Sequence, residues 1–195
     1  MEKFATISGD IISYTSLSDK DRTKLAKSIK SLLSDLKDRY RTIGFYGRLV
    51  QGDHVECVME EPGLSLRICL ILKAYVKSIN LGENENSRSD LKHFKEHAIR
   101  LAIAVGSLSK LDLKNDIIDG EAIYLSGRTI EKYSTSNKKK IVIKQTLFFR
   151  SPNKELQEEF DSLIALIDTL IAKCSAKQCE VVYYKLLDFN EKEIA

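Results

Sequence analysis

The chain has 195 residues, of which 43% are hydrophobic and 30% are charged, and its formal net charge is +3. This length allows one core of up to about 150 residues together with an accessory element. The composition is that of a globular protein and excludes a disordered chain. No apolar run approaches the ~20 residues of a membrane-spanning helix. The weak positive charge permits contact with nucleic acid or nucleotides without indicating it.

The N-terminus and the cysteines both point to the cytoplasm. Residues 1–4 run straight into a strand pattern, without the basic and apolar regions of a signal peptide. The cysteines stand singly among apolar residues, which favours buried, reduced thiols. They are Cys57, Cys69, Cys174 and Cys179. His93 and His97 are interpreted as solvated, because no acidic third metal ligand accompanies them. We therefore expect a cytoplasmic protein without a membrane segment.

Hydrophobic periodicity predicts eight elements in residues 1–150. A first helix is expected to start with Ser18 and Asp21 as its capping box and to end at Gly44. Strands are expected at 4–8, 45–50, 54–59, 99–106 and 141–143, and further helices at 64–81 and 121–133. This order contains two split β-α-β units. It predicts an α+β domain with a ferredoxin-like antiparallel sheet and helices on one face.

Two aspartates are predicted to meet at one edge of this sheet. The first strand runs antiparallel to the second strand of the hairpin, so the end of one meets the start of the other. Asp10 lies at the first position and Asp53 at the second. Adjacent carboxylates repel unless a cation or a shared proton relieves them, and Mg²⁺ accepts such a pair with water and phosphate oxygens. Gly9 and Gly52 precede the aspartates, where glycine permits a tight turn and close approach of a phosphate. The alternative is that both aspartates cap turns.

Four segments, in order, resemble class III nucleotidyl cyclase domains. Residues 7–15 resemble the F-x-D-I-x-x-F-T opening of that family, and residues 50–54 resemble its Gly-Asp hairpin turn. Residues 100–106 are similar to the R-I-G-I-H-x-G strand, and residues 119–128 are similar to the Y-G-x-x-V-N-x-A-x-R segment. The resemblance is closer to SatD-like proteins, small bacterial relatives with a D-G-x-A-x-x-x-A-R segment. Together these segments cover about residues 4–132.

The resemblance implies a site for Mg²⁺ or Mn²⁺ and for a nucleotide or phosphorylated small molecule. Asp10 and Asp53 would hold the metal, with the backbone carbonyl of Ile11 as a third ligand. Arg128 would be the catalytic arginine that stabilises phosphate charge, acting across the interface of a homodimer. Its alternative role is a surface salt bridge. The residues assigned to the nucleotide are Gly9, Gly52, Arg48, Asp119 and Tyr124.

Three positions depart from the cyclase pattern. Tyr124 replaces an asparagine one helical turn before the arginine, and Leu49, next to Arg48, replaces the lysine that selects the base. The position of the base-reading aspartate falls on Ile117, beside Asp116. Metal and phosphate binding are compatible with these three changes. The changes affect the residues that recognise the base and promote cyclisation in cyclases.

Residues 151–195 are expected to form a separate helical segment. Its first helix has an apolar stripe that would pack on the first domain or on its copy in a dimer. The stripe consists of Leu156, Phe160, Leu163, Ile164, Ile167, Leu170 and Ile171. Ser175 and Asn190 each open a further helix. Residues 175–181 and 190–195 are similar to the first helix and the start of the second in LuxR-type and sigma-factor-like helix-turn-helix modules. This resemblance implies DNA binding through a recognition helix in a longer chain; the alternative is a plain dimerising tail.

Three functions are consistent with these patterns. The leading hypothesis is a transcriptional regulator whose cyclase-like domain senses a nucleotide or phosphorylated ligand with a divalent metal. The second is an active nucleotidyl cyclase or nucleotide phosphohydrolase. The third is a degenerate domain that serves only for dimerisation.

Overall fold

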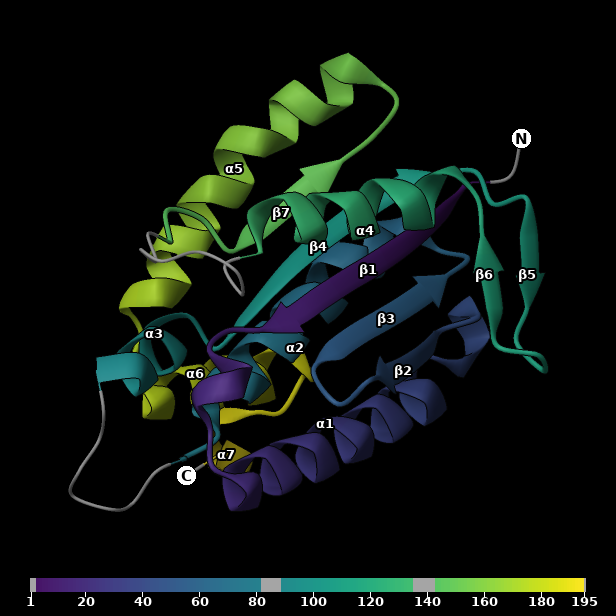
Figure 1. Cartoon of the computed structure of the whole chain (residues 1–195). Coiled ribbons are helices and arrows are strands. Elements are labelled where there is room, and N and C mark those ends of the chain that lie inside the picture. Colours follow the sequence, from purple (N-terminus) through teal and green to yellow (C-terminus); the bar gives the residue numbers. More distant parts are fainter. Residues whose placement is uncertain (1–2, 82–88, 135–142, 195) are drawn as a thin grey trace.

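A computed structural model of the chain describes residues 3–81, 89–134 and 143–194 (Figure 1). The main sheet has five strands in the order β2-β3-β1-β4-β7. Neighbouring strands are antiparallel except for β4 and β7, which are parallel. The strands are β1 (Phe4–Ile11), β2 (Tyr46–Val50), β3 (His54–Met59), β4 (Ile99–Gly106) and β7 (Leu147–Arg150). The predicted α+β fold with a ferredoxin-like strand order is therefore confirmed.

Helices cover both faces of this sheet. One face carries α1 and α2, and the opposite face carries α4, which lies across β1 and β4 (Figure 1). The prediction of helices on one face is therefore wrong, because polar side chains on the second face of β1 hydrogen-bond to α4. The long helices are α1 (Asp19–Arg39), α2 (Ser65–Ser78), α3 (Ser89–His97), α4 (Glu121–Tyr133), α5 (Lys154–Lys173) and α6 (Ala176–Leu186). The short elements are η1 (Tyr14–Ser16), η2 (Arg41–Ile43), η3 (Pro62–Leu64), α7 (Glu191–Ile194) and the hairpin of β5 (Lys110–Asp112) and β6 (Ile117–Asp119).

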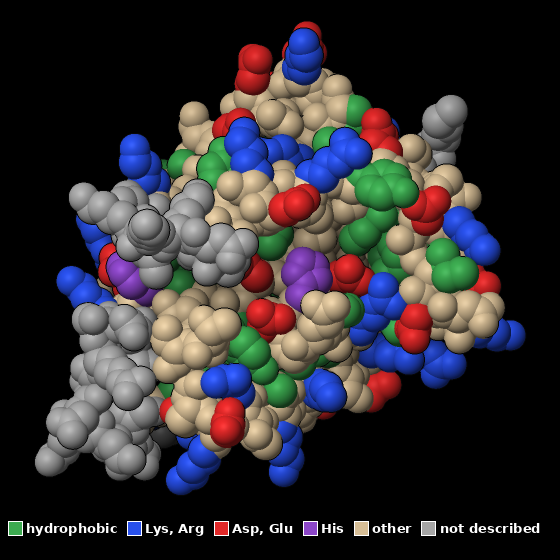
Figure 2. Space-filling view, in the orientation of Figure 1, with side chains coloured by type: hydrophobic (Ala, Val, Ile, Leu, Met, Phe, Trp, Pro, Cys, Tyr) green, Lys and Arg blue, Asp and Glu red, His purple; other side chains and the backbone are tan. Residues whose placement is uncertain are grey.

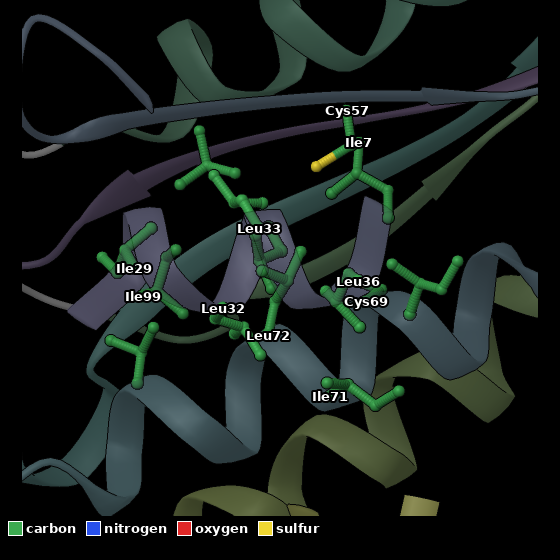
Figure 3. Packing of buried hydrophobic residues seen from close by; sticks show 14 of the residues in the cluster. Ile7, Ile29, Leu32, Leu33, Leu36, Cys57, Cys69, Ile71, Leu72 and Ile99 are labelled. Carbon is green, nitrogen blue, oxygen red and sulfur yellow. The ribbon is translucent and has the colours of Figure 1, made fainter. Parts of the chain in front are cut away.

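The alternation of side chains along β1 explains why both of its faces are covered. Ile7 points into the apolar core between the sheet and the helices α1 and α2, and Ile99 of β4 lies in the same core (Figure 3). Thr6 and Ser8 point the other way, and their hydroxyl oxygens lie 3.1 and 2.8 Å from that of Ser126 in α4. The second face of β1 is thus partly polar, whereas its first face meets an apolar core.

The first helix begins at the predicted cap but ends at Arg39, before the end that the sequence predicts at Gly44. Ser18 Oγ accepts a hydrogen bond from the Asp21 N–H at 3.1 Å, which satisfies an otherwise free amide. After Arg39 the chain makes one 3-10 turn and reaches Gly44, whose φ of +63° suits glycine. The buried stripe of α1 consists of Leu25, Ile29, Leu32, Leu33 and Leu36. Each such side chain contributes roughly 1.5–3 kcal/mol through burial.

Three features differ from the sequence expectation. The polar stretch after β4 contains the β5–β6 hairpin, whose three-residue strands are too short to show an alternating pattern. Positions 141 and 142 of the strand expected at 141–143 lie outside the described residues, and β7 is the strand that pairs with β4. The expectation that His97 is solvated is wrong. The residue is 9% exposed, and its backbone carbonyl accepts a hydrogen bond from Lys73 of α2 at 3.2 Å.

The cysteines are free thiols. Cys57, Cys69 and Cys179 are buried, as predicted, whereas Cys174 is only partly covered. Burial raises the pKa of the Cys57 and Cys69 thiols, which keeps them protonated and unreactive.

The helix α5 is joined to the sheet through the buried carboxylate of Asp168. Its two oxygens accept hydrogen bonds from the Thr146 hydroxyl at 2.7 Å and from the Thr146 and Leu147 N–H groups at 2.5 and 3.2 Å. Lys73 Nζ of α2 lies 3.4 Å from the same carboxylate, and its side chain is 1% exposed. One carboxylate therefore holds the start of β7, the middle of α5 and the buried face of α2 together.

A second buried lysine continues this attachment. Lys77 Nζ donates to the carbonyls of Ile171 and Ala172 at the end of α5, at 2.8 and 2.6 Å, and to that of Glu96. A cation at a helix C-terminus is also favoured by the helix dipole. The following helix, α6, packs along α2. The boundary expected near residue 150 stays a prediction. Of the helices that follow it, α5 contacts β7 and α6 contacts α2. None of the helices in the described ranges has both the length and the apolar character needed to cross a membrane.

We expect Asp168→Asn to lower the free energy of unfolding by about 3–5 kcal/mol, because it leaves Lys73 buried without its counterion. Urea denaturation followed by circular dichroism measures this change. Asp161→Asn, on the same helix with a half-exposed side chain 3.4 Å from Arg150, is the matched control and should cost no more than about 1 kcal/mol. Equal losses in the two variants would contradict the role given to Asp168.

Candidate functional site

The two predicted metal aspartates lie where β1 ends and the β2–β3 turn closes. We call this region, at one end of the central strands, the aspartate edge. Asp10 is the register partner of His54 in β3 and of Arg100 in β4. One residue further, the Ile11 N–H donates to the carbonyl of Asp53 at 3.0 Å. Both aspartate side chains are partly buried. The antiparallel register thus joins the backbone segments that carry the two carboxylates.

The turn before Asp53 depends on a glycine. Gln51 and Gly52 have φ angles of 52° and 87°, both in the left-handed region. A Cβ atom at Gly52 would also lie 2.8 Å from the hydroxyl of Tyr14. Tyr14 of η1 therefore packs against the turn, and a side chain at Gly52 would displace it.

Glycine is required at position 9 for a different reason. It lies inside β1, and a Cβ atom there would come within 2.5 Å of the Leu101 side chain and 2.8 Å of the Arg100 carbonyl. A methyl group would collide with the neighbouring strand, so glycine is required for the close approach of β4 to β1.

Arg100 is the ionic partner of Asp10. Its Nη1 donates to both carboxylate oxygens, at 2.9 and 2.7 Å, and its side chain is only 1% exposed. Arg100 Nε is buried and has no hydrogen-bond partner within the described residues. A buried guanidinium needs a nearby anion, and Asp10 provides it. Removing Asp10 alone would therefore leave an unpaired buried charge.

The surroundings of Asp10 act on its pKa in opposite directions. Burial is the largest effect and raises the pKa above the usual value of an aspartate. Arg100 lowers the pKa through its charge and hydrogen bonds, and His54 also lowers it. The carboxylate of Asp53 raises it, as expected for a neighbouring like charge. The net result is a raised pKa of Asp10, with burial as its main cause.

A band of polar groups extends from this edge across β3 and β2. Arg48 of β2 donates through Nε and Nη2 to Glu56 at 2.9 and 2.6 Å, and through Nη1 to the carbonyl of Asp116 at 2.6 Å. The hydroxyl of Tyr46 donates to Asp116 Oδ1 at 2.5 Å. His54 Nε2 lies 3.9 Å from the Glu56 carboxylate. Figure 2 shows acidic side chains and a histidine gathered around a hollow near the middle of this face.

The remaining predicted residues form a second polar group at the start of α4. Tyr124 donates its hydroxyl proton to Asp119 at 2.6 Å, and Ser109 donates to the other oxygen of that carboxylate. The hydrogen bond from Tyr124 lowers the pKa of Asp119. The exposed guanidinium of Arg128 lies 5.7 Å from the centre of the Tyr124 ring. Within the described ranges Arg128 forms no ion pair, so the alternative of a surface salt bridge finds no partner there.

The donor set at the aspartate edge is sparse for a metal. Among residues 3–81, 89–134 and 143–194 no three His, Cys, Asp or Glu side chains lie close enough together to hold an ion. Asp10 and Asp53, with Arg100 beside them, leave one net negative charge when His54 is neutral. Such a site fits a Mg²⁺ or Mn²⁺ ion that arrives with phosphate oxygens and water, because Mg²⁺ needs one or two protein carboxylates and fills its other positions in that way.

Two cavities of about 230 Å³ each lie away from this edge. One is lined by residues of α2, α3 and α6, including Lys77 and Phe94. The other lies between α1 and α6 and is lined by Leu36, Tyr183 and Phe189, among others. Both are lined partly by residues of the C-terminal helices, and neither is lined by Asp10 or Asp53.

The sequence matches no protein-family profile and no curated protein. Three of the solved structures to which the chain is similar are nucleotide cyclases. A bacterial light-regulated adenylyl cyclase is 14% identical with a TM-score of 0.49, over 75% of this chain and 74% of that one. The adenylyl cyclase CyaB from P. aeruginosa is 15% identical with a TM-score of 0.47, over 67% and 71%. A guanylyl cyclase is 12% identical with a TM-score of 0.49, over 75% and 74%. At this level the similarity concerns overall architecture alone.

Sequence reasoning missed the roles of Arg100 and His54. Arg100 was visible as a charge inside the otherwise apolar run 99–105, a pattern that signals a buried and therefore paired ion. His54 follows Asp53 directly, but only the pairing of β1 with β3 brings it opposite Asp10.

We expect Asp53→Asn to lower the pKa of Asp10, because it removes the neighbouring charge that raises it. Titration of the Asp10 side-chain carboxyl by carbon-13 NMR measures the change. Asp38→Asn, an exposed position on α1, is the matched control and should leave the pKa of Asp10 unaltered. An Asp10 pKa that is the same in Asp53→Asn and the wild type would show that the two carboxylates are not neighbours.

Proposed function

We propose that the chain is a regulatory protein that binds a nucleoside polyphosphate, or a related phosphorylated small molecule, together with Mg²⁺ or Mn²⁺ at the edge formed by Asp10 and Asp53. The observation that carries the proposal is the 3.0 Å hydrogen bond from the Ile11 N–H to the Asp53 carbonyl, which joins the two aspartate-bearing segments. Both side chains are only partly buried, so an ion can reach them from solvent.

Each group at this edge has a proposed role. Asp10 and Asp53 hold the cation, and the carbonyl of Ile11 is its third protein ligand. The cation, when bound, neutralises phosphate charge. The space beside Gly9 is filled by Leu101 and that beside Gly52 by Tyr14, so the role of these glycines is to shape the strand and the turn that carry the aspartates. The two carboxylates leave most coordination positions of the ion to phosphate oxygens and water.

Further contacts to the nucleotide are proposed for the polar groups nearby. Arg48 is positioned by Glu56 and Asp116, and Tyr124 and Asp119 are hydrogen-bonded to each other. Arg128 is exposed and has no ion pair within the described ranges, so its guanidinium is available to a phosphate. Following the resemblance to cyclases, this phosphate would be bound to the other subunit of a homodimer.

The alternative function is catalysis of nucleotide cyclisation or phosphohydrolysis by Asp10, Asp53 and Arg128. The available guanidinium of Arg128 favours it. The hydroxyl of Tyr124, in the place of an asparagine, is occupied by Asp119, which favours binding without turnover. A domain that neither binds nor converts nucleotides would serve for dimerisation alone.

The transcriptional part of the proposal concerns the C-terminal helices. Ser175 and Gln178 form a capping box at the start of α6, and Asn190 Oδ1 accepts the N–H groups of Lys192 and Glu193 at the start of α7. These are the helix starts that the resemblance to helix-turn-helix modules requires. We propose DNA as the partner of a module that these helices begin, and the packing of α6 on α2 connects that module to the sensor domain.

Isothermal titration of ATP and GTP in the presence of Mg²⁺ or Mn²⁺ tests the proposed site. We expect binding by the wild type, and at least about hundredfold weaker binding, or about 2.8 kcal/mol, in the double variant Asp10→Asn with Asp53→Asn. Asn at position 10 has nearly the same side-chain shape as Asp, so it fills the space beside Arg100 but lacks the carboxylate charge. Asp38→Asn is the control for a lost surface carboxylate and should bind as the wild type does.

The products of the same mixtures, separated by chromatography, distinguish the alternatives. Unchanged nucleotide indicates a sensor, whereas a cyclic or hydrolysed product that Arg128→Ala abolishes indicates an enzyme. Absence of binding by the wild type at millimolar nucleotide would refute the metal–nucleotide site and leave dimerisation as the function.

A further inference from the structure

The helix α5 has two apolar faces, and only one of them is covered. Ile164, Asp168 and Ile171 point toward the sheet domain and are buried. Leu163 and Leu170 belong to the apolar stripe predicted from the sequence, and Leu166 lies beside it. Leu163, Leu166 and Leu170 are 46%, 58% and 56% exposed. Figure 1 shows α5 along one side of the molecule, beyond β7. The docking through Asp168 therefore turns a row of leucines toward solvent.

These leucines form the middle of a longer exposed row. Glu159, Leu163, Leu166, Leu170 and Lys173 follow one another at intervals of four, three, four and three residues, and all five are exposed. This alternating spacing keeps the side chains on one side of a helix and is the pattern by which two helices pack along each other. Surface leucines normally occur singly, so three at this spacing indicate a contact surface.

The opposite charges at the two ends of the row favour one kind of partner, a second copy of the same helix. Glu159 lies seven residues before Leu166, and Lys173 lies seven residues after it. Within residues 3–81, 89–134 and 143–194 neither charge takes part in an ion pair. In a second copy of the helix packed antiparallel, the acidic end of each row lies beside the basic end of the other, whereas a parallel copy would bring like charges together. The charges of two such rows are therefore complementary only when the two helices are antiparallel.

We propose that this face of α5, defined by Glu159, Leu163, Leu166, Leu170 and Lys173, binds the same face of a second copy of the chain in antiparallel orientation. The interface is isologous, as two-fold symmetric dimers require, because each row supplies both its acidic and its basic end. Leu166 lies near the two-fold axis, and the two Glu159–Lys173 contacts flank it. This surface is remote in sequence from Asp10 and Asp53 and does not depend on the proposed nucleotide site.

Sedimentation velocity of the complete chain over about 1–100 μM measures the association. We expect a monomer–dimer equilibrium in the wild type, and a dissociation constant at least about tenfold higher in Leu166→Glu, which puts two charges near the axis. The leucine is exposed, so the variant should keep its circular dichroism spectrum and melting temperature. Glu158→Lys, an exposed change outside the row, is the control and should dimerise as the wild type does.

Charge reversal tests the antiparallel orientation. Glu159→Lys or Lys173→Glu alone places like charges together at both ends and should weaken the dimer by about fivefold, in the range measured for exposed ion pairs. The double variant, Glu159→Lys with Lys173→Glu, restores both pairs and should dimerise as the wild type does. A wild type that is monomeric over the whole range, or a dimer that is indifferent to Leu166→Glu, would overturn the proposal. Failure of the double variant to recover would overturn the antiparallel orientation.

Discussion

The strand β1 is hydrogen-bonded on both sides, to β3 and to β4, and the register of these two pairings positions every group at the aspartate edge. It places His54 and Arg100 on either side of Asp10, and it brings the Asp53 carbonyl to the Ile11 N–H. A shift of one residue in either pairing would turn alternate side chains to the opposite face. Ile7 would then leave the core and Asp10 would enter it, so the apolar core enforces the register on which the site depends.

Among the described residues, the buried arginine, lysines and aspartate each have a polar partner. Arg100 is held by Asp10, Lys73 by Asp168 and three oxygen acceptors, and Lys77 by backbone carbonyls. An isolated buried ion would cost several kcal/mol, whereas a paired ion in a polar cage costs far less. These pairs also have a geometric effect, because they accept only one arrangement of the segments they join. Asp168 thereby sets the rotation of α5 about its own axis, and that rotation decides which leucines meet solvent.

Regular elements with strong local signals could be predicted. The strand at Ile99–Gly106 and the helix at Glu121–Tyr133 have the predicted bounds, and Ser18 and Ser175 cap the helices they were expected to cap. The adjacency of the Asp10 and Asp53 segments was also predictable, since it follows from strand order. The β5–β6 hairpin could not be predicted. It is stabilised by a hydrogen bond of Ser109 and by contacts of Asp116 with β2, a strand that is far from it in the sequence.

The sequence by itself determined the α+β class, the order of the strands and the segments that carry the two aspartates, because periodicity, caps and turn residues act over a few neighbouring positions. Only the tertiary structure decided that Arg100 neutralises Asp10, that Arg48 is shared between Glu56 and Asp116, and that the apolar stripe of α5 is divided into a buried and an exposed face. Each of these depends on pairs of residues brought together from separate strands and helices. Their energies are set by burial and distance, which no local pattern of residues contains.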